Sequence, residues 1–265
     1  MKLKILIAIA IACAAVTESA AVTSADRETL IRSIAEANAQ MPMSAGMLGT
    51  MTSATVSKDT IIYNMSLDEM ITSMSNDSDK RPDTRIDKQY IIDQQSLMVE
   101  LEPDMGYFYR TVSDCGMYLK LQYHNPRYDT YRSVTLTPGE MRRITVGRPD
   151  YGNLADHLIR DTQRGLPVTT SGLTITAFRK EGSDIVTHCT VDEDVASFET
   201  MKRNVGLMKD TYLQTLRNKT ELTTVYSAYM LAKAGYNQKC IYTGSQCGES
   251  ISYSVTALEI LDNLK

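Results

Sequence analysis

The sequence contains no tryptophan, and only three phenylalanines and three histidines among its 265 residues. It also lacks a glycine-rich phosphate loop, a GxSxG nucleophile motif and an HExxH zinc motif, whose residue spacings are set by their chemistry. His124, His157 and His188 have no serine or cysteine at the spacing of a catalytic pair, and no Cys or His pair has ligand spacing. We therefore expect a protein that is not an enzyme and holds no cofactor or metal ion.

Strong charge of one sign is absent as well. The formal net charge is -4 and the pI is near 5.5, whereas nucleic-acid binders usually carry a basic face. After residue 21 no apolar run approaches the roughly 20 residues that cross a bilayer. We expect neither a nucleic-acid partner nor a transmembrane segment in the mature chain.

The first 21 residues have the layout of a secretory signal. Two lysines precede an apolar run over 5–16, and small residues follow at 19–21. We expect cleavage near residue 20 or 21 and a mature protein in the periplasm or at the cell surface. A lipid anchor at Cys13 is an alternative, because the three residues before it form a loose lipobox.

Export would place the remaining cysteines in an oxidising compartment. Cys115, Cys189, Cys240 and Cys247 allow three full pairings. Cys240 and Cys247 flank the predicted turn of a hairpin, so we favour a disulfide between them. The alternative, that Cys189 and Cys240 are small core residues on inward strand faces, stays open.

The chain contains an internal repeat. Residues 116–141 align with 235–260 without a gap, so that five identities fall together: Gly116 with Gly235, Lys120 with Lys239, Tyr123 with Tyr242, Thr137 with Thr256, and Glu140 with Glu259. Upstream, Pro42 matches Pro167. A repeat of this length indicates a duplicated structural unit. We expect a signal peptide over 1–21, a first lobe over 22–147 and a second lobe over 148–265.

Each copy shows the same series of periodic patterns. Apolar residues at helical spacing over 26–38 predict a first helix, and residues 250–255 alternate polar and apolar as a half-buried strand does. Glycine at 116 and 235 predicts left-handed helix caps, and Thr137 and Thr256 each begin a capping box. The expected class is α+β, with a duplicated α-ββ-α-ββ unit and antiparallel sheets that carry helices on one face.

The second hairpin of the first copy is rich in tyrosine and arginine, the residues that interfaces favour. Its candidate contact residues are Arg127, Tyr128, Tyr131 and Arg132. The matching positions of the second copy hold Gln246, Cys247, Ser250 and Ile251, so the fold does not require this surface. We expect it to bind another protein or an envelope component. The alternative, that half of these rings belong to the core, remains open.

In its signal segment, duplicated layout and aromatic hairpins, the chain resembles uncharacterised secreted proteins of gut-type bacteria. Its tandem layout is also similar to that of the beta-lactamase-inhibitory proteins, although no stretch matches their binding loops. The resemblance implies an extracytoplasmic protein that acts by surface contact. Our leading hypothesis is a non-catalytic exported binding protein. The alternatives are an enzyme with a site between the lobes and a structural envelope component.

Overall fold

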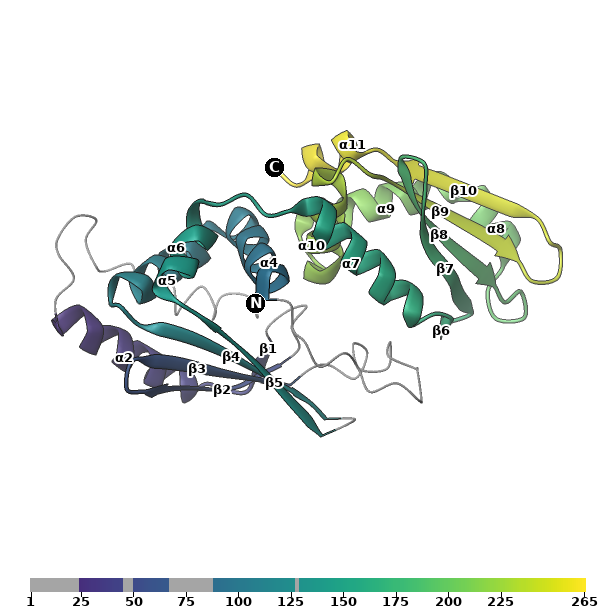
Figure 1. Ribbon diagram of the computed structural model, residues 1–265. Helices are drawn as coiled ribbons and strands as arrows, with labels where there is room; N and C mark the ends of the chain where they lie inside the picture. Colours follow the sequence, from purple (N-terminus) through teal and green to yellow (C-terminus); the bar gives the residue numbers. More distant parts are fainter. Residues whose placement is uncertain (1–23, 45–49, 67–87, 127–128) are drawn as a thin grey trace. The chain divides into compact units, whose positions relative to one another are not determined.

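The computed structural model describes residues 24–44, 50–66, 88–126 and 129–265 (Figure 1). The predicted signal segment, with Cys13, lies outside these residues. The described residues form two compact units, which divide between Asp150 and Tyr151. None of the helices in the described ranges is long and apolar enough to cross a membrane.

The first unit carries a five-stranded sheet with the order β1-β2-β3-β4-β5. Its elements are α2 (Ser24–Asn38), β1 (Met43–Ser44), β2 (Thr50–Ser57), β3 (Thr60–Ser66), α4 (Lys88–Leu101), α5 (Pro103–Asp114), β4 (Tyr118–Asn125), β5 (Thr130–Leu136) and α6 (Pro138–Val146).

The second unit carries a sheet with the equivalent order, β6-β7-β8-β9-β10. Its elements are α7 (Tyr151–Arg164), β6 (Val168–Thr170), β7 (Leu173–Glu181), β8 (Asp184–Val191), α8 (Phe198–Arg203), α9 (Val205–Asn218), α10 (Leu222–Lys233), β9 (Asn237–Gly244), β10 (Ser250–Val255) and α11 (Ala257–Asn263).

The central pair of strands in each sheet is parallel, whereas the sequence patterns predict antiparallel sheets. β3 pairs with β4, and β8 with β9, in parallel register. The physical reason is the connection between the two hairpins, because helices between them return the chain to the end of the sheet from which β3 or β8 started. The remaining described pairs are antiparallel. The α+β class and the duplicated layout are confirmed.

Gly116 and Gly235 occupy equivalent places in the two units. Each follows the helix before the second hairpin, and their φ angles are 66° and 86°. The residue after each glycine donates its N–H to the carbonyl of Val112 or Leu231, at 3.1 and 2.9 Å. This hydrogen bond belongs to the Schellman motif. The predicted left-handed caps are therefore confirmed, and the repeat holds in three dimensions.

Thr137 and Thr256 begin α6 and α11 with complete capping boxes, as the sequence predicts. The hydroxyl of each threonine accepts the N–H of Glu140 or Glu259, and the glutamate carboxylate accepts the threonine N–H at 2.8 Å. Two otherwise unpaired N–H groups of each helix end are satisfied in this way.

A β-bulge lies at the same place in the first hairpin of both units. The register shifts at Thr52 in β2 and at Thr176 in β7. Their hydroxyls donate to the carbonyls of Asn64 and His188 across the hairpin, at 3.1 and 3.2 Å. Asn64 and His188 are therefore structural equivalents.

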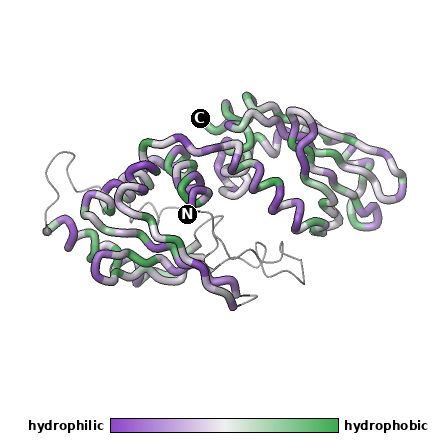
Figure 2. Tube along the Cα trace, viewed as in Figure 1, coloured by the Kyte–Doolittle hydropathy of each residue, from purple (hydrophilic) through white to green (hydrophobic). Residues whose placement is uncertain are grey.

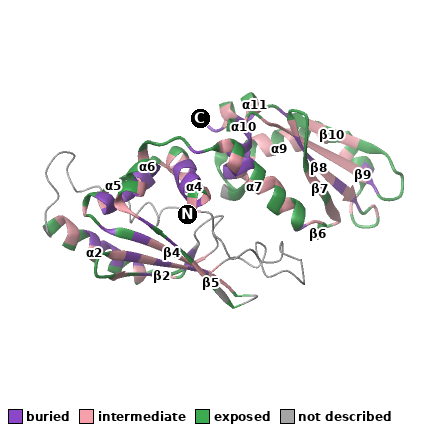
Figure 3. Ribbon diagram, in the orientation of Figure 1, coloured by how far each residue is buried: buried purple, intermediate pink, exposed green. Residues whose placement is uncertain are grey.

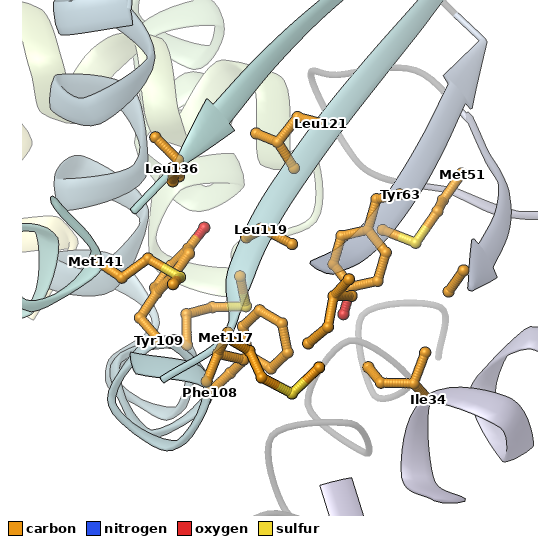
Figure 4. Close-up of a cluster of buried hydrophobic side chains, with 14 of the residues drawn as sticks. Ile34, Met51, Tyr63, Phe108, Tyr109, Met117, Leu119, Leu121, Leu136 and Met141 are labelled. Carbon is orange, nitrogen blue, oxygen red and sulfur yellow. The ribbon is translucent and has the colours of Figure 1, made fainter. Parts of the chain in front are cut away.

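A single hydrophobic cluster fills the first unit, between the sheet and its helices (Figure 4). Alternate strand residues such as Ile61 and Leu119 are fully buried on the inner face of the sheet. The ring of Phe108 on α5 stacks on Tyr63 of β3, with centroids 5.9 Å apart, and Ile34 of α2 lies in the same cluster. Burial of one face of each strand leaves the other face of the sheet polar.

The described residues of the second unit form smaller clusters instead, including the two that follow. One lies around Leu216, Val225 and Val255, and the other around Ala155 and Ile185. Hydrophobic and hydrophilic residues alternate along α7, which buries only its apolar side (Figure 2). Much of the sheet β7 to β10 is only half-buried (Figure 3).

Polar side chains lie on the inner face of the second sheet where the first unit has apolar ones. Cys240 and Tyr253 stand at the positions of Leu121 and Val134, and both are half-buried. Burial raises the pKa of the Cys240 thiol. Hydrogen bonds with Tyr253 and two other neighbouring side chains lower this pKa, but the effect of burial is larger. The inner face of this unit is therefore held together partly by hydrogen bonds.

Cys240 and Cys247 are both free thiols, so the predicted disulfide is wrong. Cys240 lies inside β9, four residues before its end at Gly244, which corresponds to about 13 Å of strand. The sulfur of Cys247 lies beside Gly244, whereas a disulfide needs Cα atoms within about 7 Å of each other. Cys189 is a buried core residue, 7% exposed, as the open alternative predicts.

Candidate binding site

The outer face of the first sheet, opposite the hydrophobic cluster, carries two rows of polar side chains. Asn64 and Ser66 of β3 and Gln122 and His124 of β4 alternate with the core positions, and all four are half-buried. The two rows run across the strands. The register places Asn64 beside Gln122 in the first row, and Ser66 beside His124 in the second. Tyr131 of β5 continues the second row. Because paired residues point to the same side of a sheet, these side chains form one surface.

The two rows line a pocket of about 240 Å³, which we call the outer-face pocket. Its lining residues are Thr52, Ser53, Asn64, Met65, Ser66, Gln122, His124 and Tyr131. Among them only histidine ionises near neutral pH. Within the described ranges, no three His, Cys, Asp or Glu side chains are grouped to hold a metal ion. The pocket therefore offers mainly neutral hydrogen-bonding groups.

Hydrogen bonds hold one side of the pocket in place. The Asn64 amide Nδ2 donates to Ser53 Oγ at 2.7 Å, and the hydroxyl of Thr52 donates to the Asn64 carbonyl at 3.1 Å. The bulge at Thr52 adds one residue to β2, which brings both Thr52 and Ser53 to the pocket. The amide of Asn64 is thus held in a fixed orientation.

An aromatic pair forms the other side of the pocket. The rings of His124 and Tyr131 stack with centroids 4.4 Å apart and an interplanar angle of 17°. His124 Nε2 lies 3.0 Å from Asp129 Oδ1 in the turn between the strands. Tyr131 is 63% exposed, so much of its ring surface is available for contact.

The structure separates Tyr131 from Arg132, two of the four residues predicted as a binding face. Arg127 and Tyr128 lie outside the described residues. Tyr131 lines the outer-face pocket, but Arg132 is the next residue of β5 and lies in register with the core residue Tyr123. Successive strand residues point to opposite faces, so Tyr131 and Arg132 are not on one surface.

Sequence reasoning identified Tyr131 but missed Asn64, Gln122 and His124 as its companions. The available signal was the polar residue at every second position of β3 and β4, opposite the apolar ones. That signal predicts which face of each strand is exposed to solvent, but it does not predict that β3 and β4 are neighbours.

The second unit has the same strand register without the same chemistry. Its register places His188 beside Ile241 and Thr243 beside Ser250. The residues at the matching positions are His188, Ile241, Thr243 and Ser250 in place of Asn64, Gln122, His124 and Tyr131. The side chains of the outer-face pocket are therefore not needed to build the fold.

Comparison with known proteins gives no family for this chain. No protein-family model matches the sequence, and no curated protein matches it. A solved structure described as a "putative secreted protein" from Pseudomonas aeruginosa is similar at 15% identity. The match covers 42% of this chain and 93% of that chain, with a TM-score of 0.34. A similarity at this level carries no argument about fold or function.

Proposed function

We propose that this chain is a non-catalytic exported protein that binds a ligand at the outer-face pocket. The observation that carries the proposal is the difference between the units, because Gln122 and Tyr131 stand where the second unit has Ile241 and Ser250 in the same register. Export rests on the signal layout of residues 1–21.

The surroundings of His124 favour binding over catalysis. Ser66 lies beside His124 in the register, but the ring of His124 stacks on Tyr131 and its Nε2 contacts Asp129. The side chain of Asp129 is 85% exposed, so water competes for its contact with the ring nitrogen of His124. A catalytic histidine must be free to reach the atom that it protonates or deprotonates, whereas this ring is held by Tyr131 and Asp129.

Capture from an envelope extract tests the binding proposal. The bait is the exported protein, compared with a Gln122→Ala/Tyr131→Ala variant and a matched Ile241→Ala/Ser250→Ala variant of the second unit. We expect wild type and the second-unit variant to retain the same ligand, and the first-unit variant to retain about tenfold less. Equal capture by all three would overturn the proposal. Ester hydrolysis that Ser66→Ala abolishes would overturn its non-catalytic part.

Fractionation tests export. Expression of the full chain in a Gram-negative host should give a periplasmic or surface protein whose intact mass lacks residues 1–21. A mass that shows acylation at Cys13 would replace free export by a lipid anchor. A full-length cytoplasmic product would contradict export.

A further inference from the structure

The lining of the outer-face pocket selects against charged ligands. Five of its side chains are neutral hydroxyl or amide groups, those of Thr52, Ser53, Asn64, Ser66 and Gln122. Among the lining residues that the structure describes, none is lysine, arginine, aspartate or glutamate. A charged ligand would lose hydration here, and the described lining offers it at most the imidazole of His124, which already contacts Asp129. A neutral ligand rich in hydroxyl groups can exchange its water contacts for these amides and hydroxyls.

The aromatic side of the pocket adds a flat apolar surface. The ring of Tyr131 is supported by His124 and largely exposed. The face of an aromatic ring carries partial negative charge and attracts C–H groups that are polarised by neighbouring oxygens. A sugar ring presents such C–H groups on its face and hydroxyls around its edge, which matches a ring platform beside hydrogen-bonding groups.

The spacing of the two rows suits one sugar ring. Asn64 and Gln122 lie on neighbouring strands about 4.8 Å apart, and Gln122 lies about 6.7 Å along β4 from His124. The volume of about 240 Å³ is below the roughly 300 Å³ at which sites for drug-sized ligands begin. The pocket thus has room for one ring of a longer chain, with its face on Tyr131 and its hydroxyls on the amides.

We infer that the outer-face pocket binds a neutral sugar ring of an oligosaccharide. This inference rests on the proposed function and names its ligand class. The hydroxyl and amide side chains fix the orientation of the sugar ring through hydrogen bonds, and the ring of Tyr131 provides the apolar contact area.

Saturation-transfer NMR tests the inference with defined probes. Maltotriose and chitotriose serve as neutral oligosaccharides, and trigalacturonate serves as a charged one. We expect the full exported chain to bind at least one neutral probe and to bind trigalacturonate at least tenfold more weakly. Tyr131→Ala and Gln122→Ala should each weaken the neutral probe about tenfold, Tyr131→Phe should retain it, and Ser250→Ala should leave it unchanged. A thermal unfolding curve checks that each variant is folded.

The outcomes separate this inference from the proposed function. Binding of trigalacturonate as tightly as the neutral probes would overturn it. The inference would also be overturned if no sugar bound while the chain captured a protein through Tyr131. The proposed function would then stand. If the Tyr131 and Gln122 variants bound sugar and captured the envelope ligand as well as wild type does, both the inference and the proposed function would be overturned.

Discussion

Lys209 Nζ lies 2.7 Å from Glu259 Oε1 and so ties α9 to the first turn of α11. Glu259 also accepts the N–H of Thr256 at 2.8 Å. The hydrogen bond from Lys209, followed by that from Thr256, lowers the pKa of Glu259 from its ordinary 4.5 to about 2. Lys88 and Glu140 repeat the ion pair in the first unit, also at 2.7 Å.

The charge of Glu259 should make stability depend on pH between about 4.5 and 2. Because the folded-state pKa is depressed, the stabilisation is complete above the unfolded pKa and is lost as pH falls through the folded pKa. Glu259→Gln can keep the capping hydrogen bonds but removes the charge. The variant should be less stable than wild type by no more than about 1 kcal/mol at neutral pH, since the carboxylate is 39% exposed. Urea titrations from pH 7 to pH 2 measure this difference, and a difference that stays constant down to pH 2 would contradict it.

The capping threonines should contribute equally in the two units. Thr137→Ala and Thr256→Ala each remove a side-chain acceptor from a helix start, which costs about 1 kcal/mol of unfolding free energy. Thr256→Ser keeps the hydroxyl and should stay close to wild type. If serine were as destabilising as alanine, the cap would not be the source of the effect.

The inner faces of the two sheets should respond differently to truncation. Leu121 is 4% exposed in the single cluster of the first unit, so Leu121→Ala should cost about 2–5 kcal/mol. Its counterpart Cys240 is smaller and half-buried, and Cys240→Ala should cost less than about 1.5 kcal/mol. Chemical denaturation of both variants gives the comparison. Equal losses would show that the second sheet is packed as tightly as the first.

Gly116 should be sensitive to its backbone conformation rather than to space. An added Cβ at Gly116 meets nothing within 4 Å, but φ is +66°. Gly116→Ala should therefore cost about 1–2 kcal/mol, the penalty of a left-handed residue with a side chain. Gly139, in the first turn of α6, has equal space without the positive φ. Gly139→Ala should be neutral or stabilise by up to about 1 kcal/mol, and a loss there would contradict the conformational explanation.

The described cysteines should differ in reactivity. Burial raises the pKa of Cys189 to about 11, and the residue is 7% exposed, whereas Cys247 is exposed. Since the thiolate is the reactive form, iodoacetamide at about pH 8 should modify Cys247 first and Cys189 much later. Peptide mass spectrometry of the native protein measures the order. A non-reduced peptide that joins Cys240 to Cys247 would contradict the structure.

Features with short-range causes were predictable from the sequence. The helix caps at Gly116 and Gly235 and the capping boxes at Thr137 and Thr256 depend on hydrogen bonds within a few residues, so the local residue types specify them. The repeat and the half-buried strands followed from pattern alone. Of the candidate site, only Tyr131 was identified in this way.

The tertiary structure decided which of these local elements meet. The parallel pairing of β3 with β4 depends on how the helices between the hairpins pack on the sheet, and that packing joins residues far apart in the chain. This pairing alone places Asn64 beside Gln122 and creates the outer-face pocket. It also sets Tyr131 and Arg132 on opposite faces and keeps Cys240 away from Cys247, because strand geometry overrides nearness in sequence.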